Sequence, residues 1–173
     1  PNVECEGMAF GVDPKVVEQV TKAVRKVTDK PVIVKLSPNV TDIVEIAKAV
    51  EAGGGNGVSL INTLLGMAID IHRRKPLLGN IYGGLSGPAV KPVALRMVHQ
   101  VYKGVTIPII GLGGIMSGTD AIEFMMAGAQ AVQVGTATMV DPTAISRIAR
   151  EMGDYVERYN LNSITDIVGA VHQ

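Results

Sequence analysis

Apolar runs of strand length alternate along this chain with amphipathic segments of helical length. The runs that predict buried strands are rich in β-branched and aliphatic residues: Pro31–Leu36, Val58–Asn62, Ile107–Ile110 and Ala131–Val134. A helix-like segment follows each of the runs. Such alternation predicts an α/β fold in which the strands form a parallel sheet with right-handed crossover connections.

Helix start and stop signals place the helices between these runs. Asp13-Pro14 reads as an N-cap and a first helical residue, and valines at helical spacing continue that helix to about Val27. Thr41-Asp42, with Glu45 three residues after the aspartate, begins a second helix that ends at Gly53–Gly55. Further helices are expected from Pro88 to about Lys103, from about Thr119 to Ala127, from Asp141-Pro142 to about Tyr159 and, as a short final one, at Ser163 with Asp166. The residues before the first helix read as a loop.

The connection over residues 63–87 is too long to be a simple turn, and long connections often have a function. It contains the basic run His72–Lys75, which we expect to be a solvated loop surface. It ends in the glycine-rich segment Gly83–Gly87, directly before the helix that Pro88 opens.

Composition narrows the class of protein. The chain has 173 residues, enough for one domain with a sizeable core, and 47% of them are hydrophobic while only 3% are aromatic. Lys plus Arg equals Asp plus Glu, 16 each, so no net charge recruits nucleic acid or an anionic membrane. No apolar run has the length of a membrane span, and the single cysteine, which cannot form an internal disulfide, fits a reducing compartment. We therefore expect a cytoplasmic α/β protein.

The number of predicted strands leaves two architectures open. Four strands cannot close a (β/α) barrel, which needs eight. The chain is then either a small open sheet or part of a larger barrel. The loop-like start at Pro1, without a methionine, favours the larger barrel.

Glycines at the strand ends predict a phosphate site. The run Ile107–Ile115 reads I-P-I-I-G-L-G-G-I, and the next strand ends in Gly135-Thr136. Each precedes a helix-like segment, and Gly83–Gly87 offers a third glycine-bearing segment before a helix. Glycine lets backbone N–H groups approach a phosphate closely at the carboxyl ends of parallel strands. A flexible loop with a helix C-cap is the alternative for any one of these segments alone.

Polar side chains at two strand ends add candidate ligand contacts. Lys35, in V-K-L-S-P, could neutralise an anion that develops on a ligand; alternatively its stem packs while its ammonium meets water. Asn62-Thr63 ends the strand V-S-L-I-N-T, and its amide suits a planar, amide-rich ligand, or else forms an Asx turn. Cys5 has no neighbouring base or metal partner, and no Cys/His cluster has metal-site spacing.

Taken together and in order, the motifs resemble the dihydroorotate dehydrogenase family, class 1B. They are P-N-V-E-C-E-G-M-A-F-G, V-K-L-S-P, S-L-I-N-T-L-L-G-M-A-I-D, G-G-L-S-G-P-A, I-I-G-L-G-G-I and V-Q-V-G-T. The resemblance covers essentially the whole chain. It implies a (β/α)8 TIM barrel that binds FMN and oxidises dihydroorotate to orotate in pyrimidine biosynthesis. Residues 1–173 would be the C-terminal part of that single domain and supply strands 5 to 8.

The resemblance also implies a role for each matching residue. Lys35 would contact the flavin ring and favour electron density on it, and Ile61 would line the flavin with its backbone. The substrate would be hydrogen-bonded by Asn2, Asn62 and Thr63. FMN would be held by Gly87, Gly113, Gly114, Gly135 and Thr136, the last four around its phosphate.

In the family the catalytic base is a cysteine immediately before the position of Pro1, so this chain contains no catalytic base and Cys5 does not replace it. We expect the chain alone to be inactive without the N-terminal half of the barrel. Class 1B further implies a homodimer of catalytic subunits and a second subunit, with FAD and a [2Fe–2S] cluster, that passes electrons to NAD. The segments N-V-E-C-E-G-M-A-F-G and I-N-T-L-L-G-M-A-I-D favour this class over fumarate-using relatives.

Two rival functions stay open at this point. One is another FMN or sugar-phosphate barrel that shares the phosphate site, although Lys35 and Asn62-Thr63 argue against it. The other is a non-catalytic binding module, an open four-stranded sheet that holds a phosphate ligand or a partner.

Overall fold

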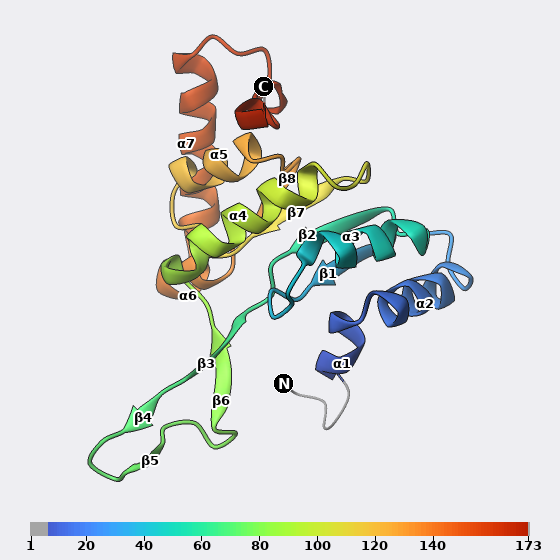
Figure 1. Cartoon of the computed structure of the whole chain (residues 1–173). Coiled ribbons are helices and arrows are strands. Elements are labelled where there is room, and N and C mark those ends of the chain that lie inside the picture. Colours follow the sequence, from blue (N-terminus) through green and yellow to red (C-terminus); the bar gives the residue numbers. More distant parts are fainter. Residues whose placement is uncertain (1–6, 173) are drawn as a thin grey trace.

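The computed structural model describes residues 7–172, and a four-stranded parallel sheet lies at its centre (Figure 1). Its strands are β1 (Ile33–Leu36), β2 (Gly57–Leu60), β7 (Ile109–Leu112) and β8 (Ala131–Gln133), and their order in the sheet is their order in the chain. All the pairings between neighbours are parallel. The sequence prediction of a parallel α/β sheet is confirmed, and the sheet is consistent with part of a (β/α)8 barrel.

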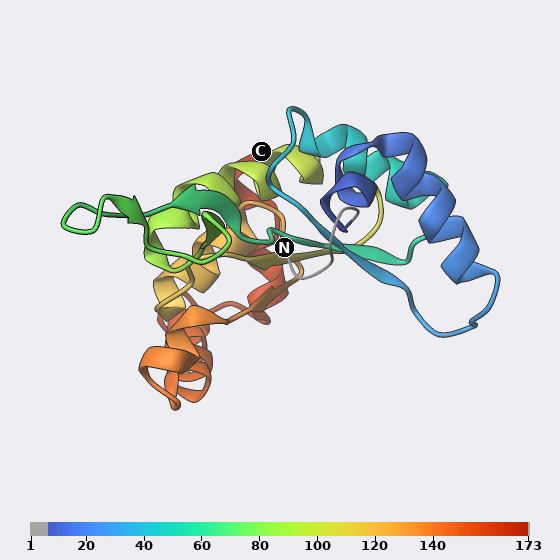
Figure 2. The ribbon, with the colours of Figure 1, turned by 90° about the horizontal axis from the view of Figure 1, so that it is seen from below.

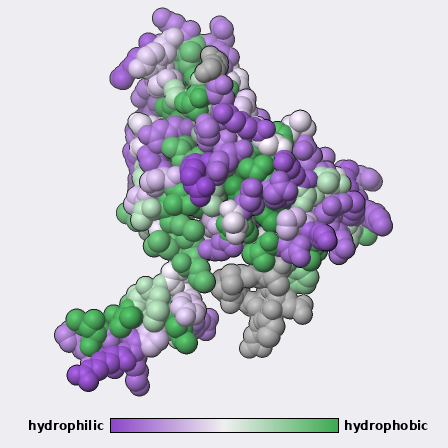
Figure 3. Space-filling view, viewed as in Figure 1, coloured by the Kyte–Doolittle hydropathy of each residue, from purple (hydrophilic) through white to green (hydrophobic). Residues whose placement is uncertain are grey.

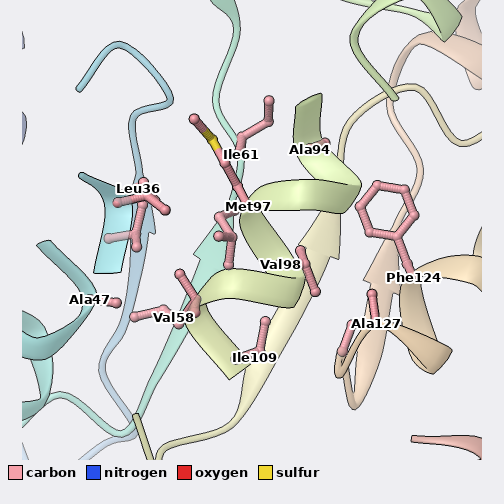
Figure 4. Close-up of a cluster of buried hydrophobic side chains, with 14 of the residues drawn as sticks. Leu36, Ala47, Val58, Ile61, Ala94, Met97, Val98, Ile109, Phe124 and Ala127 are labelled. Atoms are coloured by element: carbon pink, nitrogen blue, oxygen red, sulfur yellow. The ribbon is translucent and has the colours of Figure 1, made fainter. Parts of the chain in front are cut away.

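Three helices cover one face of this sheet and form the core with it. They are α3 (Ile43–Ala52), α4 (Lys91–Tyr102) and α5 (Gly118–Met126). Figure 4 shows Met97 and Val98 of α4 against Val58 of β2 and Ile109 of β7, and these four side chains are buried. Burial of each aliphatic side chain contributes about 1.5–3 kcal/mol, so this interface between helices and sheet carries much of the stability.

The expected caps start several helices. Asp13 accepts a hydrogen bond from Lys15 N at α2 (Pro14–Arg25), and Asp42 accepts from Val44 N and Glu45 N at α3. The Ser163–Asp166 capping box is present, at the 3-10 helix Ile164–Ile167. The segment from Pro88 begins as a short 3-10 helix, Pro88–Val90, before α4.

Two helices were not predicted. The residues before α2, expected to be a loop, include α1 (Gly7–Val12), and α6 (Thr136–Val140) follows β8 directly. The helix expected from Asp141-Pro142 is α7 (Ala144–Arg158), with Thr143 at its N-cap, and a 3-10 helix, Ala170–His172, closes the described chain. α1 and α6 have only six and five residues, too few for a repeated hydrophobic period to reveal them.

The long connection after β2 forms an arm of two antiparallel ladders. β3 (Leu64–Met67) pairs with β6 (Tyr82–Leu85), and β4 (Ile69–Asp70) pairs with β5 (Lys75–Pro76). Figures 1 and 2 show the arm standing away from the sheet and its helices. In Figure 3 its surface is part hydrophobic and part hydrophilic. The basic run His72–Lys75 lies near its tip and is exposed, as expected. Its exposed apolar side chains are Leu65, Met67, Ile69, Ile71, Leu77, Leu78, Ile81, Tyr82 and Leu85.

Both outer strands of the central sheet have one unpaired edge within residues 7–172, because β1 pairs there only with β2 and β8 only with β7. An apolar hollow of about 430 Å³ lies beside β1 and is lined by side chains that include Val20 and Val24 of α2. A second hollow, of about 560 Å³, lies beside β8 and includes Ile145 and Ile148 of α7. No helix of the described part of the chain is long and apolar enough to cross a membrane.

Candidate functional site

The carboxyl ends of the four parallel strands open into one cavity of about 150 Å³. Every predicted site residue that the structure describes lines it: Lys35, Ile61, Asn62, Thr63, Gly87, Gly113, Gly114, Gly135 and Thr136. Asn2 lies outside the described residues. These residues belong to segments that lie far apart in the chain, so the fold brings the segments together.

The end of β2 is held on both sides by neighbouring strands. Ile61 N donates to Leu112 O at 2.8 Å, and Asn62 N donates to Leu36 O at 2.9 Å. Ile61 is buried, whereas the Asn62 side chain is exposed at the cavity. The backbone is thus fixed at Asn62 while its amide group is accessible to a ligand.

Backbone geometry requires glycine at two positions after β7. Gly113 and Gly114 have φ values of +131° and +77°, a region that side-chain-bearing residues rarely adopt. A Cβ atom on Gly114 would lie 2.7 Å from Gly87 O and 2.9 Å from Lys91 N. The segments that carry Gly87 and Gly114 are therefore in direct backbone contact.

Four residues that line this cavity offer backbone N–H groups to a ligand. Among residues 7–172, no acceptor is found for the backbone N–H groups of Gly113, Gly114, Gly135 and Thr136. The Thr136 hydroxyl donates to Ser86 Oγ at 3.1 Å, which joins the segment before α4 to the start of α6. Backbone N–H groups at glycine-bearing strand ends can donate to an anionic ligand.

Among residues 7–172, Lys35 supplies the one cationic side chain that lines this cavity. It lies in register with Ser59 of β2 and is exposed. Within the described ranges no carboxylate lies within ion-pair distance of its ammonium group. Its charge can therefore act on a ligand.

Charged side chains that do not line the cavity hold the segment after β7. Asp120 accepts from Met116 N and Ser117 N, both at 2.9 Å, and forms a capping box with Ser117. Burial by itself would raise the pKa of the Asp120 carboxyl, but hydrogen bonds from Lys91, Met116 and Ser117 hold that pKa below its ordinary value. On α7, Glu151 accepts from Gly118 N, and this bond lowers the pKa of its carboxyl.

Sequence reasoning missed several residues that line the cavity: Leu85, Ser86, Val90, Leu112 and Gln133. Ser86 lies inside the glycine-rich segment that was singled out, so only its side chain was overlooked. Gln133 is the last residue of β8, and its place at a strand end next to Gly135 was the available signal. No group of three or more His, Cys, Asp or Glu that could hold a metal ion is found among the described residues.

Comparison with known proteins gives one consistent result. The family model described as dihydroorotate dehydrogenase matches residues 1–156. The chain is 61% identical over 169 residues to a protein of Alkaliphilus oremlandii, covering 98% of the chain and 56% of the relative. It is 62% identical over 172 residues to a protein of Desulforamulus reducens, covering 99% of the chain and 57% of the relative. Both relatives are described as the catalytic subunit of dihydroorotate dehydrogenase B (NAD(+)). The chain thus spans just over half the length of these relatives.

Proposed function

Because this chain belongs to the dihydroorotate dehydrogenase family, we propose that it is the C-terminal part of an FMN enzyme that oxidises (S)-dihydroorotate to orotate in de novo pyrimidine synthesis. The observation that carries this proposal is the single cavity at the strand ends, where a cation, an amide side chain and a group of backbone donors converge. Two curated relatives that are named as this enzyme support it.

The cavity suits the phosphate of FMN. The unpartnered N–H groups of Gly113, Gly114, Gly135 and Thr136 would donate to the phosphate oxygens. The close approach of Gly87 to Gly114 leaves no room for side chains there, so a phosphate meets bare backbone. The volume of about 150 Å³ is below the roughly 300–1,000 Å³ of small-molecule sites. This cavity would therefore hold only part of FMN, with the phosphate at the glycines and the ring over Ile61 and Lys35.

The other strand-end side chains would hold the substrate and the flavin. Lys35 would place its positive charge at the flavin ring and favour negative charge there. Asn62 and Thr63, with Asn2, would donate and accept hydrogen bonds to the amide and carboxylate groups of dihydroorotate. FMN, when bound, would supply the two-electron acceptor for the hydride of the substrate. In the family, a cysteine immediately before the position of Pro1 removes the C5 proton; that position lies outside this sequence.

The rest of the barrel would come from chain that precedes Pro1. Residues 1–173 would then be one part of a single (β/α)8 domain, with strands 5 to 8. The unpaired edges of β1 and β8, each beside an apolar hollow, support this, since a closed barrel leaves no strand edge unpaired. The first and last strands of the missing half would pair with these two edges.

The names of the relatives, which describe a catalytic subunit of an NAD(+)-linked enzyme, support a proposal about the assembly. We propose a homodimer of catalytic subunits that works in the cytoplasm with an electron-transfer subunit. That subunit would carry FAD and a [2Fe–2S] cluster and pass the electrons to NAD. The exposed apolar side chains of the arm offer surface for subunit contacts.

The test uses this chain joined behind the N-terminal part of the Alkaliphilus oremlandii relative, which we call the joined protein. The joined protein should bind FMN, show flavin absorption and convert dihydroorotate to orotate. The 173-residue chain alone, given FMN and dihydroorotate, should show no turnover. Turnover by the chain alone would refute the assignment of the base to the missing part. A colourless joined protein that binds a sugar phosphate tightly would favour the rival barrel enzyme, and a joined protein that binds a phosphate ligand without turnover would favour the non-catalytic module.

The electron acceptor has its own test. With the electron-transfer subunit of the same relative added, the joined protein should reduce NAD, and without that subunit it should not. Efficient fumarate reduction by the joined protein alone would place it with the fumarate-using relatives instead.

A further inference from the structure

The two segments that bring glycines to the phosphate cavity are linked by an ion pair behind them. Lys91 is the first residue of α4, just after the 3-10 turn that follows Gly87. Its Nζ lies 2.6 Å from Asp120 Oδ1 on α5. The other oxygen of Asp120 accepts the hydrogen bonds from Met116 N and Ser117 N, in the segment that follows Gly113-Gly114.

This link is strong enough to affect geometry. The Lys91 side chain is 25% exposed and that of Asp120 15%, so solvent screens the pair only partly. Charge-assisted hydrogen bonds shorter than about 2.9 Å are about twice as strong as neutral ones. The hydrogen bonds to Asp120 and Glu123 also raise the pKa of Lys91, so its ammonium stays charged at any physiological pH.

Neither Lys91 nor Asp120 lines the cavity, so neither contacts a ligand there. Their contacts act on a ligand through the backbone that they hold. That backbone is closely packed at this point, because Gly114 lies against Gly87 O and Lys91 N without room for a methyl group. A small shift of either segment therefore changes the distance between the N–H donors and a phosphate.

We propose that the Lys91–Asp120 ion pair is the positioning element of the phosphate site, which sets the affinity for the phosphate group of the ligand by holding the Gly87 and Gly113-Gly114 segments at one fixed separation. The proposal rests on the proposed function, since the phosphate concerned is that of FMN. Lys91 and Asp120 are positioning residues and take no part in the chemistry.

Glu123 provides a matched control. Its carboxylate lies 2.8 Å from Lys91 Nζ, yet it is more exposed, at 40%, and no hydrogen bond joins it to the segment after β7 within the described chain. Glu123→Gln therefore removes one ion pair of Lys91 and leaves the link through Asp120 intact.

The experiment compares FMN with riboflavin, which has the same ring and ribityl chain but no phosphate. Affinities of the apo form of the joined protein for both flavins are measured by quenching of flavin fluorescence. The variants are Lys91→Met, Asp120→Asn, the double variant and Glu123→Gln. Asp120→Asn keeps an oxygen acceptor for Met116 N and Ser117 N and is therefore the milder change. It still tests the proposal if the Lys91→Met variant does not fold.

Lys91→Met and Asp120→Asn should each weaken FMN binding by about tenfold or more, the value of one charge-assisted hydrogen bond. Riboflavin binding should stay within about twofold, because the ring and chain contacts remain. The double variant should lose no more FMN affinity than either single variant, since both substitutions break the same ion pair. Glu123→Gln should bind FMN like the unchanged protein.

Unchanged FMN affinity in both single variants, or an equal loss for FMN and riboflavin, would overturn the positioning role. A joined protein that without substitutions binds no FMN, or binds FMN no better than riboflavin, would instead overturn the proposed function. The two failures are therefore distinguishable.

Discussion

Asn39 Nδ2 donates a hydrogen bond to the main-chain oxygen of Thr63 at 3.1 Å, although the two residues belong to loops after different strands. The other end of the same amide accepts from Leu65 N at 2.9 Å. Asn39 therefore ties the loop after β1 to the base of the arm, immediately after the candidate substrate residues Asn62 and Thr63. Asn39 therefore contacts the backbone that carries the Asn62 and Thr63 side chains, but it does not line the cavity.

Replacing Asn39 with alanine should raise the KM for dihydroorotate by about three- to tenfold, since each lost hydrogen bond is worth about 0.5–1.5 kcal/mol. FMN affinity should change little, because the phosphate segments do not contact Asn39. Steady-state kinetics of the joined protein test this. Asn39→Asp is the informative comparison, because an aspartate still accepts from Leu65 N but cannot donate to Thr63 O. A KM equal to that of the unchanged protein in both variants would contradict the prediction.

Gly114→Ala should destabilise the joined protein and abolish tight FMN binding. The φ of +77° alone costs a residue with a Cβ about 1–2 kcal/mol, and the contact with Gly87 O and Lys91 N adds strain. Urea unfolding measures the loss. Gly135→Ala is the matched control for stability, because its φ is −112° and no atom lies within 4 Å of the added Cβ. The free energy of unfolding of the Gly135→Ala variant should stay within about 0.5 kcal/mol of that of the unchanged protein. An equal loss of stability in the Gly114→Ala and Gly135→Ala variants would refute the steric argument.

Gly153→Ala should stabilise the protein. Gly153 is an exposed residue in the interior of α7, and an added Cβ meets nothing within 4 Å. Alanine in a helix interior is more favourable than glycine by about 0.5–1 kcal/mol. Urea unfolding should show a higher midpoint with an unchanged slope. A lower midpoint would mean that this position needs a conformation other than the helix described.

Acidification between pH 7.5 and 5.5 should loosen the packing of the C-terminal 3-10 helix on α4. The His99 ring stacks on His172 at a centroid distance of 4.1 Å, and His172 Nε2 lies 3.0 Å from Ala127 O. Burial, then the charges of His172 and Lys103, lower the pKa of His99 below 6.5. The unfolded chain therefore binds a proton at a higher pH than the folded one does. This contribution to stability is present above pH 6.5 and is lost as the pH falls below that value.

The measurement is the thermal midpoint of the joined protein against pH. In His99→Gln, which keeps a polar side chain without a charge, the decline from pH 7.5 to 5.5 should be smaller. A decline of the same size in this variant would show that other groups cause it. Lys48→Ala, which removes an exposed ion pair with Glu45 on α3, should leave the slope unchanged.

Local signals account for the elements that were predicted well. The parallel strands are rich in aliphatic residues because helices pack on one face of the sheet. The caps at Asp13 and Asp42 bond only to backbone two or three residues away. The strands of the arm are not predicted because they have only two to four residues, too few for a hydrophobic period to mark them.

Contacts between distant residues account for what was missed. Asn39 reaches Thr63 across 24 positions, and Lys91 reaches Asp120 across 29. In the sequence Asn39 looks like an ordinary loop residue, and Lys91 and Asp120 look like ordinary residues at the starts of helices. Nothing in the local pattern distinguishes an asparagine that ties two loops from one that caps a turn.

The sequence by itself determined the order of strands and helices, the glycines at the strand ends and the family to which the chain is similar. These depend on local propensity, on hydrophobic period and on short motifs, all of which act within a few residues. Only the tertiary structure decided that Lys35, Asn62, Gly87, Gly114 and Thr136 line one cavity, and that Asn39 and the Lys91–Asp120 pair hold that cavity from outside. The reason is physical: parallel strands place residues far apart in the chain at one edge of the sheet, and the ion pairs and hydrogen bonds behind that edge form only once the strands have been paired.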